Sequence, residues 1–177
     1  MKGGGSIFLI GMMGAGKTTV GRLLARRLRL RFVDSDHEIE RRCGVKIPVI
    51  FEIEGEAGFR EREAQAIEAL TALKGIVLAT GGGVVMREEN RRHLAQGGTV
   101  VYLRARPEDL YERVRNDRNR PMLAGGDPLA RLRELHAQRD PLYLEVADVV
   151  VDTGAQSVQT LARQLLGKLE DQWKASA

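Results

Sequence analysis

The stretch GMMGAGKTTVGR, residues 11–22, decides which fold the chain is expected to adopt. Gly11, Gly16, Lys17 and Thr18 match the pattern G-x-x-x-x-G-K-[ST]. An apolar run precedes the pattern and an amphipathic stretch follows it, and this is the strand–turn–helix context that the pattern requires. Glycines let backbone N–H groups converge on an anion, and the start of a helix adds positive potential. The stretch therefore predicts a nucleotide phosphate site rather than a turn that only connects a strand to a helix.

The residues of this phosphate site are expected to have separate tasks. Lys17 would reach the β- and γ-phosphates of ATP, and the Thr18 hydroxyl would bind Mg²⁺. Further nucleotide contacts are expected from Gly11, Gly14, Ala15, Gly16 and Thr19. Mg²⁺ usually also needs a carboxylate at the end of a neighbouring strand. Two apolar runs end in aspartate, at Asp34 and Asp152, and the pattern does not choose between them.

Strand-like and helix-like stretches alternate along the chain. Five apolar runs are typical of strands, at residues 6–11, 31–34, 75–81, 99–103 and 148–153. Because they are apolar almost throughout, we expect them to be buried on both faces of a parallel sheet with helices on either side. Two segments interrupt the alternation: residues 35–74 predict a helical substrate-holding excursion, and residues 117–127 a polar lid loop.

Composition narrows the class of protein. The 177 residues are 43% hydrophobic and 29% charged, as expected for one globular domain. No apolar run approaches the roughly 20 residues of a membrane span, and the start of the sequence lacks the pattern of a secretory signal. The single cysteine, Cys43, is consistent with a reducing cytoplasm. We expect a monomer, because no apolar patch is evident.

The basic character of the chain leaves two kinds of partner open. The formal net charge is +4 and the sequence pI about 9.5, which suits either nucleic acid or anionic small ligands. Single-strand binders interleave basic residues with stacking aromatics. Here aromatic residues make up 5% of the chain and the arginines alternate with acids. Anionic small ligands are therefore favoured.

The segment DSDHEIE places Asp34 and Asp36 two residues apart at a strand end. One interpretation is structural, with Ser35 and Glu38 forming a capping box at the start of a helix. The functional interpretation gives the two acids different tasks. One would face the metal, and the other would accept or orient a hydroxyl proton.

Several arginines are candidates for binding an anion. Arg60, in GFRERE, is expected near the start of a helix, where Glu61, Glu63 or a bound ligand would offset its charge. Nine arginines and no lysine lie between residues 104 and 139. Arg120 precedes a proline in the lid loop, and Arg139 is expected in a turn. Arginine is suited to forked contacts with phosphate or carboxylate.

Three consecutive glycines, Gly81, Gly82 and Gly83, follow the third predicted strand. They leave bare backbone against which a small ligand can lie.

The chain resembles the shikimate kinase family from about Ile7 to its last helix. The resemblance rests on GMMGAGKTTVGR, DSDHEIE, GFREREA, LATGGGVV, RPML and RDPLY, in the family's order and spacing. It implies a three-layer α/β P-loop kinase fold with a five-stranded parallel sheet of order 2-3-1-4-5. It also implies one domain, 1–177, with a substrate-binding region at about 35–63 and a lid at about 115–127.

The resemblance further implies an activity. Members of this family transfer the γ-phosphate of ATP, with Mg²⁺, to the 3-hydroxyl of shikimate, on the route to chorismate and the aromatic amino acids. By the resemblance, Asp34 belongs to the magnesium shell, and Asp36 takes the shikimate hydroxyls and is the base. Arg60 and Arg139 would hold the shikimate carboxylate beside the backbone of Gly82.

The resemblance assigns the other candidates to the nucleotide. Arg120 would reach from the lid onto the transferring phosphate, and Arg113 would flank the adenine. The loop around Gln156 would cover the other side of the nucleotide. The family often has leucine where this chain has Met122.

Three alternatives remain beside this interpretation. The first is another small P-loop kinase, for gluconate or a nucleoside monophosphate, although Asp36, Arg60 and Arg139 favour a polyol that carries a carboxylate. The second is an ATPase that binds nucleic acid. The third is a nucleotide-binding protein without catalysis, against which the presence of Lys17, Asp36 and Arg120 speaks.

Overall fold

A single parallel sheet forms the centre of the molecule. The structure, a computed structural model, describes residues 5–115 and 125–175. The sheet has the strand order β2-β3-β1-β4-β5, and every neighbouring pair is parallel. The strands are β1 (Ile7–Ile10), β2 (Arg31–Asp34), β3 (Ile76–Ala79), β4 (Thr99–Arg104) and β5 (Val149–Asp152). The predicted strands and their order are thus confirmed.

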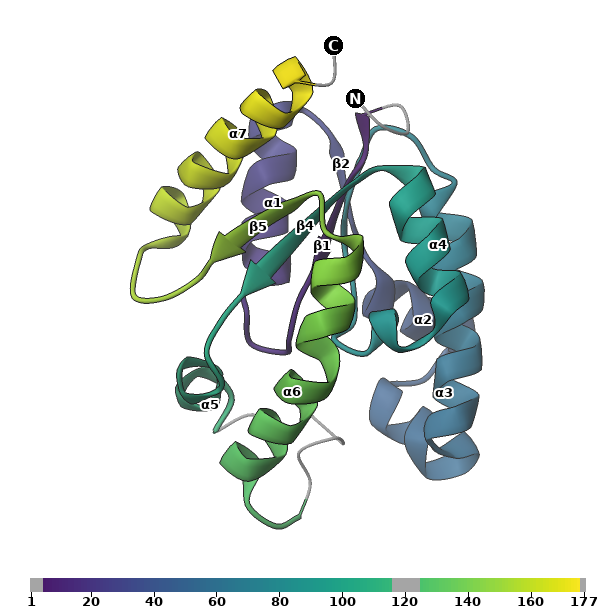
Figure 1. Cartoon of the computed structure of the whole chain (residues 1–177). Helices are drawn as coiled ribbons and strands as arrows, with labels where there is room; N and C mark the ends of the chain where they lie inside the picture. The colour runs from purple at the N-terminus through teal and green to yellow at the C-terminus, as the bar shows by residue number, and fades with distance from the viewer. Residues whose placement is uncertain (1–4, 116–124, 176–177) are drawn as a thin grey trace.

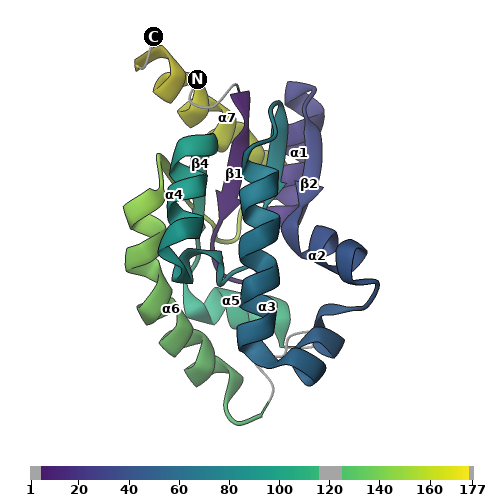
Figure 2. The same cartoon turned by 90° about the vertical axis from the view of Figure 1, so that its right-hand side faces the viewer.

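Helices cover both faces of the sheet and complete three layers. Helices α1 (Lys17–Leu28) and α7 (Val158–Ala175) cover one face, and α3 (Ile47–Thr71), α4 (Glu88–Gly97) and α6 (Pro128–Val146) cover the other (Figure 1, Figure 2). Three short elements come after the carboxyl ends of strands: α2 (Ser35–Cys43), η2 (Val84–Met86) and α5 (Pro107–Val114). None of the helices in the described part of the chain has the length and apolar character of a membrane span.

Burial differs between the central and the edge strands. All residues of β1 and β3 are buried, and β4 is buried up to its last residue, as their apolar runs predict. The prediction of burial on both faces is wrong for β2 and β5, where Arg31 and Asp152 are exposed. Both strands lie at an edge of the sheet, where one side has no neighbouring strand to cover it.

Two helices depart from the sequence expectations, and both departures shape the site. Helix α3 is kinked at Gly55, whose φ of 69° is non-helical, and Arg60 follows this kink by five residues. The expected turn at Arg139 is wrong, because Arg139 lies inside α6, which continues through Pro141. Leu132, Leu135, Arg139 and Tyr143 form the buried stripe of α6. Burial of this stripe outweighs the one helical hydrogen bond that proline removes.

Candidate active site

The phosphate loop joins β1 to α1, and its glycines have conformations that other residues rarely adopt. The φ angles are 144° at Gly11, 79° at Gly14 and 95° at Gly16. A Cβ at Gly11 would also lie 2.5 Å from the carbonyl oxygen of Leu103. Helix α1 begins at Lys17 and has no acidic residue in its first turn, so the positive potential of its N-terminus is not offset locally. The loop has the properties of an anion site.

The Lys17 ammonium lies within this loop. It is nearly buried and donates to the carbonyl oxygens of Gly11, at 2.6 Å, and Met12, at 2.8 Å. The lysine is thus held at the position where phosphates would meet the helix N-terminus.

Asp34 links the phosphate loop to α2. Its Oδ2 accepts a hydrogen bond from the Thr18 hydroxyl at 2.9 Å. Its Oδ1 accepts from the backbone N–H groups of Asp36, at 3.0 Å, and His37, at 3.2 Å, so that Asp34 is the N-cap of α2. A hydroxyl and a carboxylate side by side are the hard oxygen donors that Mg²⁺ prefers, so these two residues fit that ion.

The predicted capping box of Ser35 and Glu38 is wrong. The Ser35 hydroxyl is buried and accepts from the backbone N–H of Gly81 at 3.1 Å. Glu38 instead pairs with Arg41 and Arg42, each at 2.8 Å. With Asp34 as the cap, Ser35 is available to fix the glycine run that follows β3 to the end of β2.

Asp152, the other acid left open by the sequence, has a different partner. The Arg104 guanidinium lies 2.6 Å from Asp152 Oδ1 and 3.2 Å from Oδ2. This hydrogen-bonded arginine lowers the pKa of the Asp152 carboxyl. Asp152 is therefore paired with Arg104, whereas Asp34 accepts from the Thr18 hydroxyl at the start of α1.

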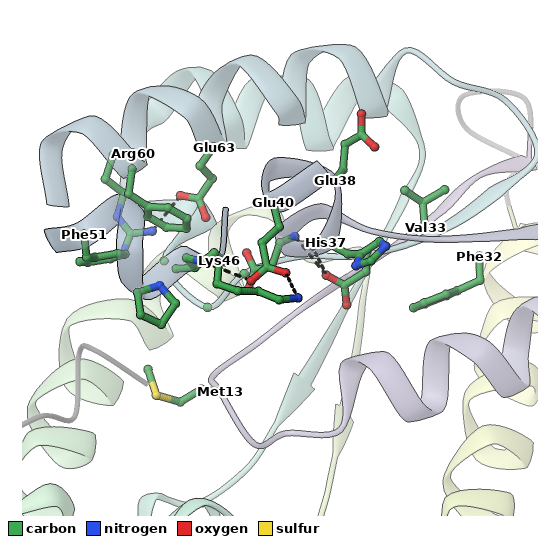
Figure 3. Close-up of a pocket in the computed structure, with 18 of the residues that line it drawn as sticks. Met13, Phe32, Val33, His37, Glu38, Glu40, Lys46, Phe51, Arg60 and Glu63 are labelled. Atoms are coloured by element: carbon green, nitrogen blue, oxygen red, sulfur yellow. Dashed lines mark hydrogen bonds and ion pairs between the residues drawn. The ribbon is translucent and has the colours of Figure 1, made fainter. Parts of the chain in front are cut away.

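A cavity of about 750 Å³ opens beside the phosphate loop (Figure 3). Its wall combines residues from distant parts of the chain, among them the loop at Met13, strand β2, helices α2, α3 and α6, and the glycines that follow β3. The predicted acceptor-site residues that line it are Asp36, Arg60, Gly81, Gly82, Gly83 and Arg139. The structure thus brings together all the residues that the sequence assigned to a carboxylated polyol.

Each glycine of the run after β3 leaves room for functional side chains of the cavity. A Cβ at Gly81 would lie 2.8 Å from Asp36 Oδ1 and 2.9 Å from Glu63 Oε2. A Cβ at Gly82 would lie 3.2 Å from Arg139 Nη1, and one at Gly83 would lie 2.5 Å from Arg60 Cζ. The side chains of Asp36, Glu63, Arg139 and Arg60 therefore all pack against the backbone of the glycine run.

The two acids above Gly81, Asp36 and Glu63, each have one carboxylate oxygen without a hydrogen-bond partner among the described residues. Burial, then Glu63 and Asp34, raises the pKa of Asp36 to about 7, although Lys17 and Arg60 act in the opposite direction. Burial also raises the pKa of Glu63, even though Arg60 Nη1 lies 2.8 Å from its Oε1. Asp36 Oδ1 and Glu63 Oε2 have no hydrogen-bond partner among the described residues. Unpartnered buried acceptors of this kind are suited to the hydroxyls of a ligand.

Arg139 has the corresponding property as a donor. It is 2% exposed, and its Nε has no hydrogen-bond partner within residues 5–115 and 125–175. Burial lowers the pKa of this guanidinium, an effect that the neighbouring Tyr143 opposes. A buried cation with an unpaired donor favours an anionic ligand.

On the other side of the phosphate loop, Arg113 and Gln156 meet at one turn. Arg113 donates to the carbonyl oxygens of Gly14, at 3.1 Å, and Gly154, at 2.8 Å. Gln156 accepts from the Gly154 N–H and donates to the Asp152 carbonyl, both at 2.7 Å. The two predicted nucleotide-binding residues thus lie beside the phosphate loop and contact the same turn.

Some predicted residues lie outside the described part, and some site residues were not predicted. Arg120, Met122 and most of the predicted lid fall outside the described residues. Glu63 was considered only as a local partner for Arg60, whereas Glu61 pairs with Arg87 at 3.0 Å. The i, i+3 spacing of Arg60 and Glu63 was a signal for their contact. Tyr143 was missed, and its place on the buried stripe of α6 would have indicated it.

Comparison with known proteins identifies the family. The family model for shikimate kinase matches residues 13–170.

The chain belongs to the shikimate kinase family.

Relatives within the shikimate kinase family match nearly the whole chain. The shikimate kinase of Thiobacillus denitrificans is 65% identical over 165 residues, which cover 93% of this chain and 90% of the relative. That of Ralstonia nicotianae is 62% identical over 165 residues, with 93% and 87% covered. The structure of shikimate kinase from Acinetobacter baumannii in complex with shikimate has a TM-score of 0.93 and 48% identity, and the match covers 95% of this chain and 94% of that one.

Membership of the shikimate kinase family confirms the predicted resemblance, the three-layer fold and the class of enzyme. The chain is a phosphotransferase that acts on an alcohol group and uses ATP and Mg²⁺.

Proposed function

We propose that the chain transfers the γ-phosphate of ATP to the 3-hydroxyl of shikimate, giving shikimate 3-phosphate and ADP for chorismate synthesis. The observation that carries the proposal is the meeting of Asp36, Arg60 and Arg139 over Gly81–Gly83, beside a phosphate loop. Shikimate is a small polyol with one carboxylate. It needs an acid for its hydroxyls and guanidinium groups for its anionic end.

In this proposal, Asp36 is the base that accepts the proton of the attacking hydroxyl. Its unpaired Oδ1 faces the same point above Gly81 as the unpaired Oε2 of Glu63. The two oxygens would accept hydrogen bonds from neighbouring hydroxyls of the substrate. Arg60 and Arg139 would bind the carboxylate in a forked arrangement, with the backbone of the glycine run beneath it.

The nucleotide is proposed to occupy the other side of the loop. Thr18 and Asp34 would hold Mg²⁺, which neutralises phosphate charge and orients the β- and γ-phosphates. Lys17 would bind those phosphates, as would the backbone N–H groups of the loop at Gly11, Gly14, Ala15, Gly16 and Thr19. Arg113 and Gln156 would flank the adenine, and Arg120 would contact the transferring phosphate.

The proposed mechanism is direct in-line transfer, in which positioning and charge neutralisation supply most of the catalysis. The segment at about 115–127 would act as a lid that excludes water and so protects ATP from hydrolysis.

The organisation of the chain is part of the proposal. We infer one kinase domain over residues 1–177, with the acceptor region at about 35–63, acting as a monomer in the cytoplasm on a small-molecule substrate. Neither nucleic acid nor membrane is proposed as a partner. Several arginines of the described part pair with neighbouring acids, as at Arg41, Arg62 and Arg133.

Release of ADP, measured side by side with shikimate, gluconate and AMP, tests the proposed acceptor. We expect turnover with shikimate at least about 100-fold above that with the other two, since only shikimate satisfies both the acids and the paired arginines. Faster turnover with gluconate or AMP would refute the proposal. Retention on heparin at moderate salt tests the nucleic-acid alternative, because phosphate-driven binding is steeply salt-dependent.

A further inference from the structure

A buried tyrosine hydroxyl contacts the backbone of the acceptor site. Tyr143 lies on α6, one helical turn after Arg139, and its side chain is fully buried. Its hydroxyl donates a hydrogen bond to the carbonyl oxygen of Gly82, the middle glycine of the run. Because the peptide unit is planar and trans, holding this carbonyl also holds the Gly83 N–H on the opposite side.

The same hydroxyl lies beside the Arg139 guanidinium. Each group influences the pKa of the other. Arg139 Nη1 also rests against Gly82, 3.2 Å from the position that a Cβ would occupy there. Tyr143 and Arg139 therefore meet at the same residue, because the hydroxyl donates to the Gly82 carbonyl and the guanidinium lies against the Gly82 backbone.

The ring and the hydroxyl of Tyr143 have separable roles. The ring packs against Tyr102, with ring centroids 4.8 Å apart and an interplanar angle of 32°. Packing in the core requires only the ring, and phenylalanine would supply it. Burying a hydroxyl costs free energy unless it is hydrogen-bonded. Burial raises the pKa of the Tyr143 hydroxyl, so the group stays a proton donor at neutral pH.

We propose that Tyr143 is a positioning residue of the acceptor site, whose hydroxyl fixes Arg139 against the glycine run and so sets the place of the substrate carboxylate. The inference rests on the proposed function and goes beyond it, since Tyr143 acts through Arg139 and Gly82 rather than by touching the reacting atoms. Its effect is specific to substrates with a carboxylate.

The matched pair of variants is Tyr143→Phe and Tyr102→Phe. Both remove one hydroxyl from the same pair of packed tyrosine rings, but the Tyr102 hydroxyl donates to Asp140, at 2.7 Å, rather than to the glycine run. For Tyr143→Phe we expect KM for shikimate to rise about tenfold, with kcat and KM for ATP within about twofold of the parent. Tyr102→Phe should leave KM for shikimate within about twofold.

Two further measurements separate positioning from general loosening of the fold. With shikimate methyl ester, which lacks the anion, Tyr143→Phe should change kcat/KM by less than about twofold. In a double-mutant cycle with Arg139→Lys, the combined rise in KM for shikimate should fall short of the product of the single effects, because both changes act on one contact. Full additivity would show that Tyr143 does not act through Arg139.

The inference is overturned if Tyr143→Phe leaves KM for shikimate unchanged, or raises KM for ATP or the methyl ester by the same factor. If the variant is isolated unfolded, the hydroxyl is shown to be needed for the fold itself and the positioning role is rejected. Failure of the proposed function is a distinct result. It would appear as a lack of shikimate turnover in the parent chain, before any variant is made.

Discussion

Replacement of Gly83 by alanine tests how the glycine run positions Arg60. The backbone at Gly83 has φ −89° and ψ 6°, which alanine adopts without difficulty, so Gly83→Ala introduces no strain of its own. The added Cβ would lie 2.5 Å from Arg60 Cζ, with both Nη atoms closer still. Carbon atoms in normal contact lie about 3.5–4.0 Å apart, so the guanidinium has to retreat by about 1 Å.

The expected change in KM for shikimate depends on how far the Arg60 guanidinium is displaced. The group that moves is the Arg60 guanidinium, at the far end of a flexible side chain. The free energy of unfolding should therefore fall by only about 1 kcal/mol, even though the ion pair with Glu63 is disturbed. A charge-assisted hydrogen bond to the substrate contributes about 1.5–3 kcal/mol, and a displacement of about 1 Å forfeits much of it. We therefore expect KM for shikimate to rise about 10- to 100-fold.

The assay compares KM for shikimate and for ATP with the melting temperature of each variant. Gly167→Ala is the matched control, because Gly167 lies in α7 with nothing within 4 Å of the added Cβ. The control should leave both KM values unchanged and raise stability by up to about 1 kcal/mol, as alanine does in place of glycine within a helix. KM for ATP should change less than about twofold in Gly83→Ala.

Two results would refute the reasoning. An unchanged KM for shikimate in Gly83→Ala would mean that Arg60 does not bind the substrate where the structure holds it. An equal loss for ATP and shikimate, with a lower melting temperature, would mean that the alanine disturbs the fold rather than one side chain.

Three further predictions address the acids and the second arginine. Asp36→Asn should lower kcat by about 10²–10⁴-fold with nucleotide binding nearly intact, and near-normal turnover would exclude Asp36 as the base. Arg139→Lys should raise KM for shikimate, because a forked contact becomes a point charge, and an unchanged KM would count against the carboxylate clamp. The fold raises the pKa of Asp36 to about 7, so the neutral carboxyl stabilises the fold at low pH. That stability is lost as pH rises toward 7, so urea unfolding should show a fall of about 3 kcal/mol between pH 5 and pH 8 that Asp36→Asn lacks. The measurement is made in EDTA, which removes Mg²⁺.

Local sequence was enough to predict the phosphate loop and the strands. Gly11, Gly14 and Gly16 have positive φ angles within a few residues of one another, and that requirement is visible in the sequence. The apolar runs of β1, β3 and β4 are visible in the same way, because a strand covered on both faces needs apolar residues at every position. The apolar runs alone did not show that β2 and β5 are less buried, because burial at an edge depends on which strands are neighbours.

Tertiary structure decided which side chains meet. The strand pattern left Asp34 and Asp152 equivalent and only the family resemblance favoured Asp34, whereas the fold brings Asp34 to Thr18 and Asp152 to Arg104. Likewise, nothing local showed that Arg139 lies within a helix rather than a turn, because the burial of its stripe depends on the sheet and helices around it.

The sequence by itself determined that this chain binds nucleotide phosphates and forms a parallel sheet, because both depend on residues close together in the chain. The family resemblance named the acceptor-site residues, but only the fold decided how they meet. The acids and guanidinium groups of the site come from α2, α3 and α6, and they converge because parallel strands deliver their following segments to one edge of the sheet. Three glycines without side chains then leave the space in which those groups can meet.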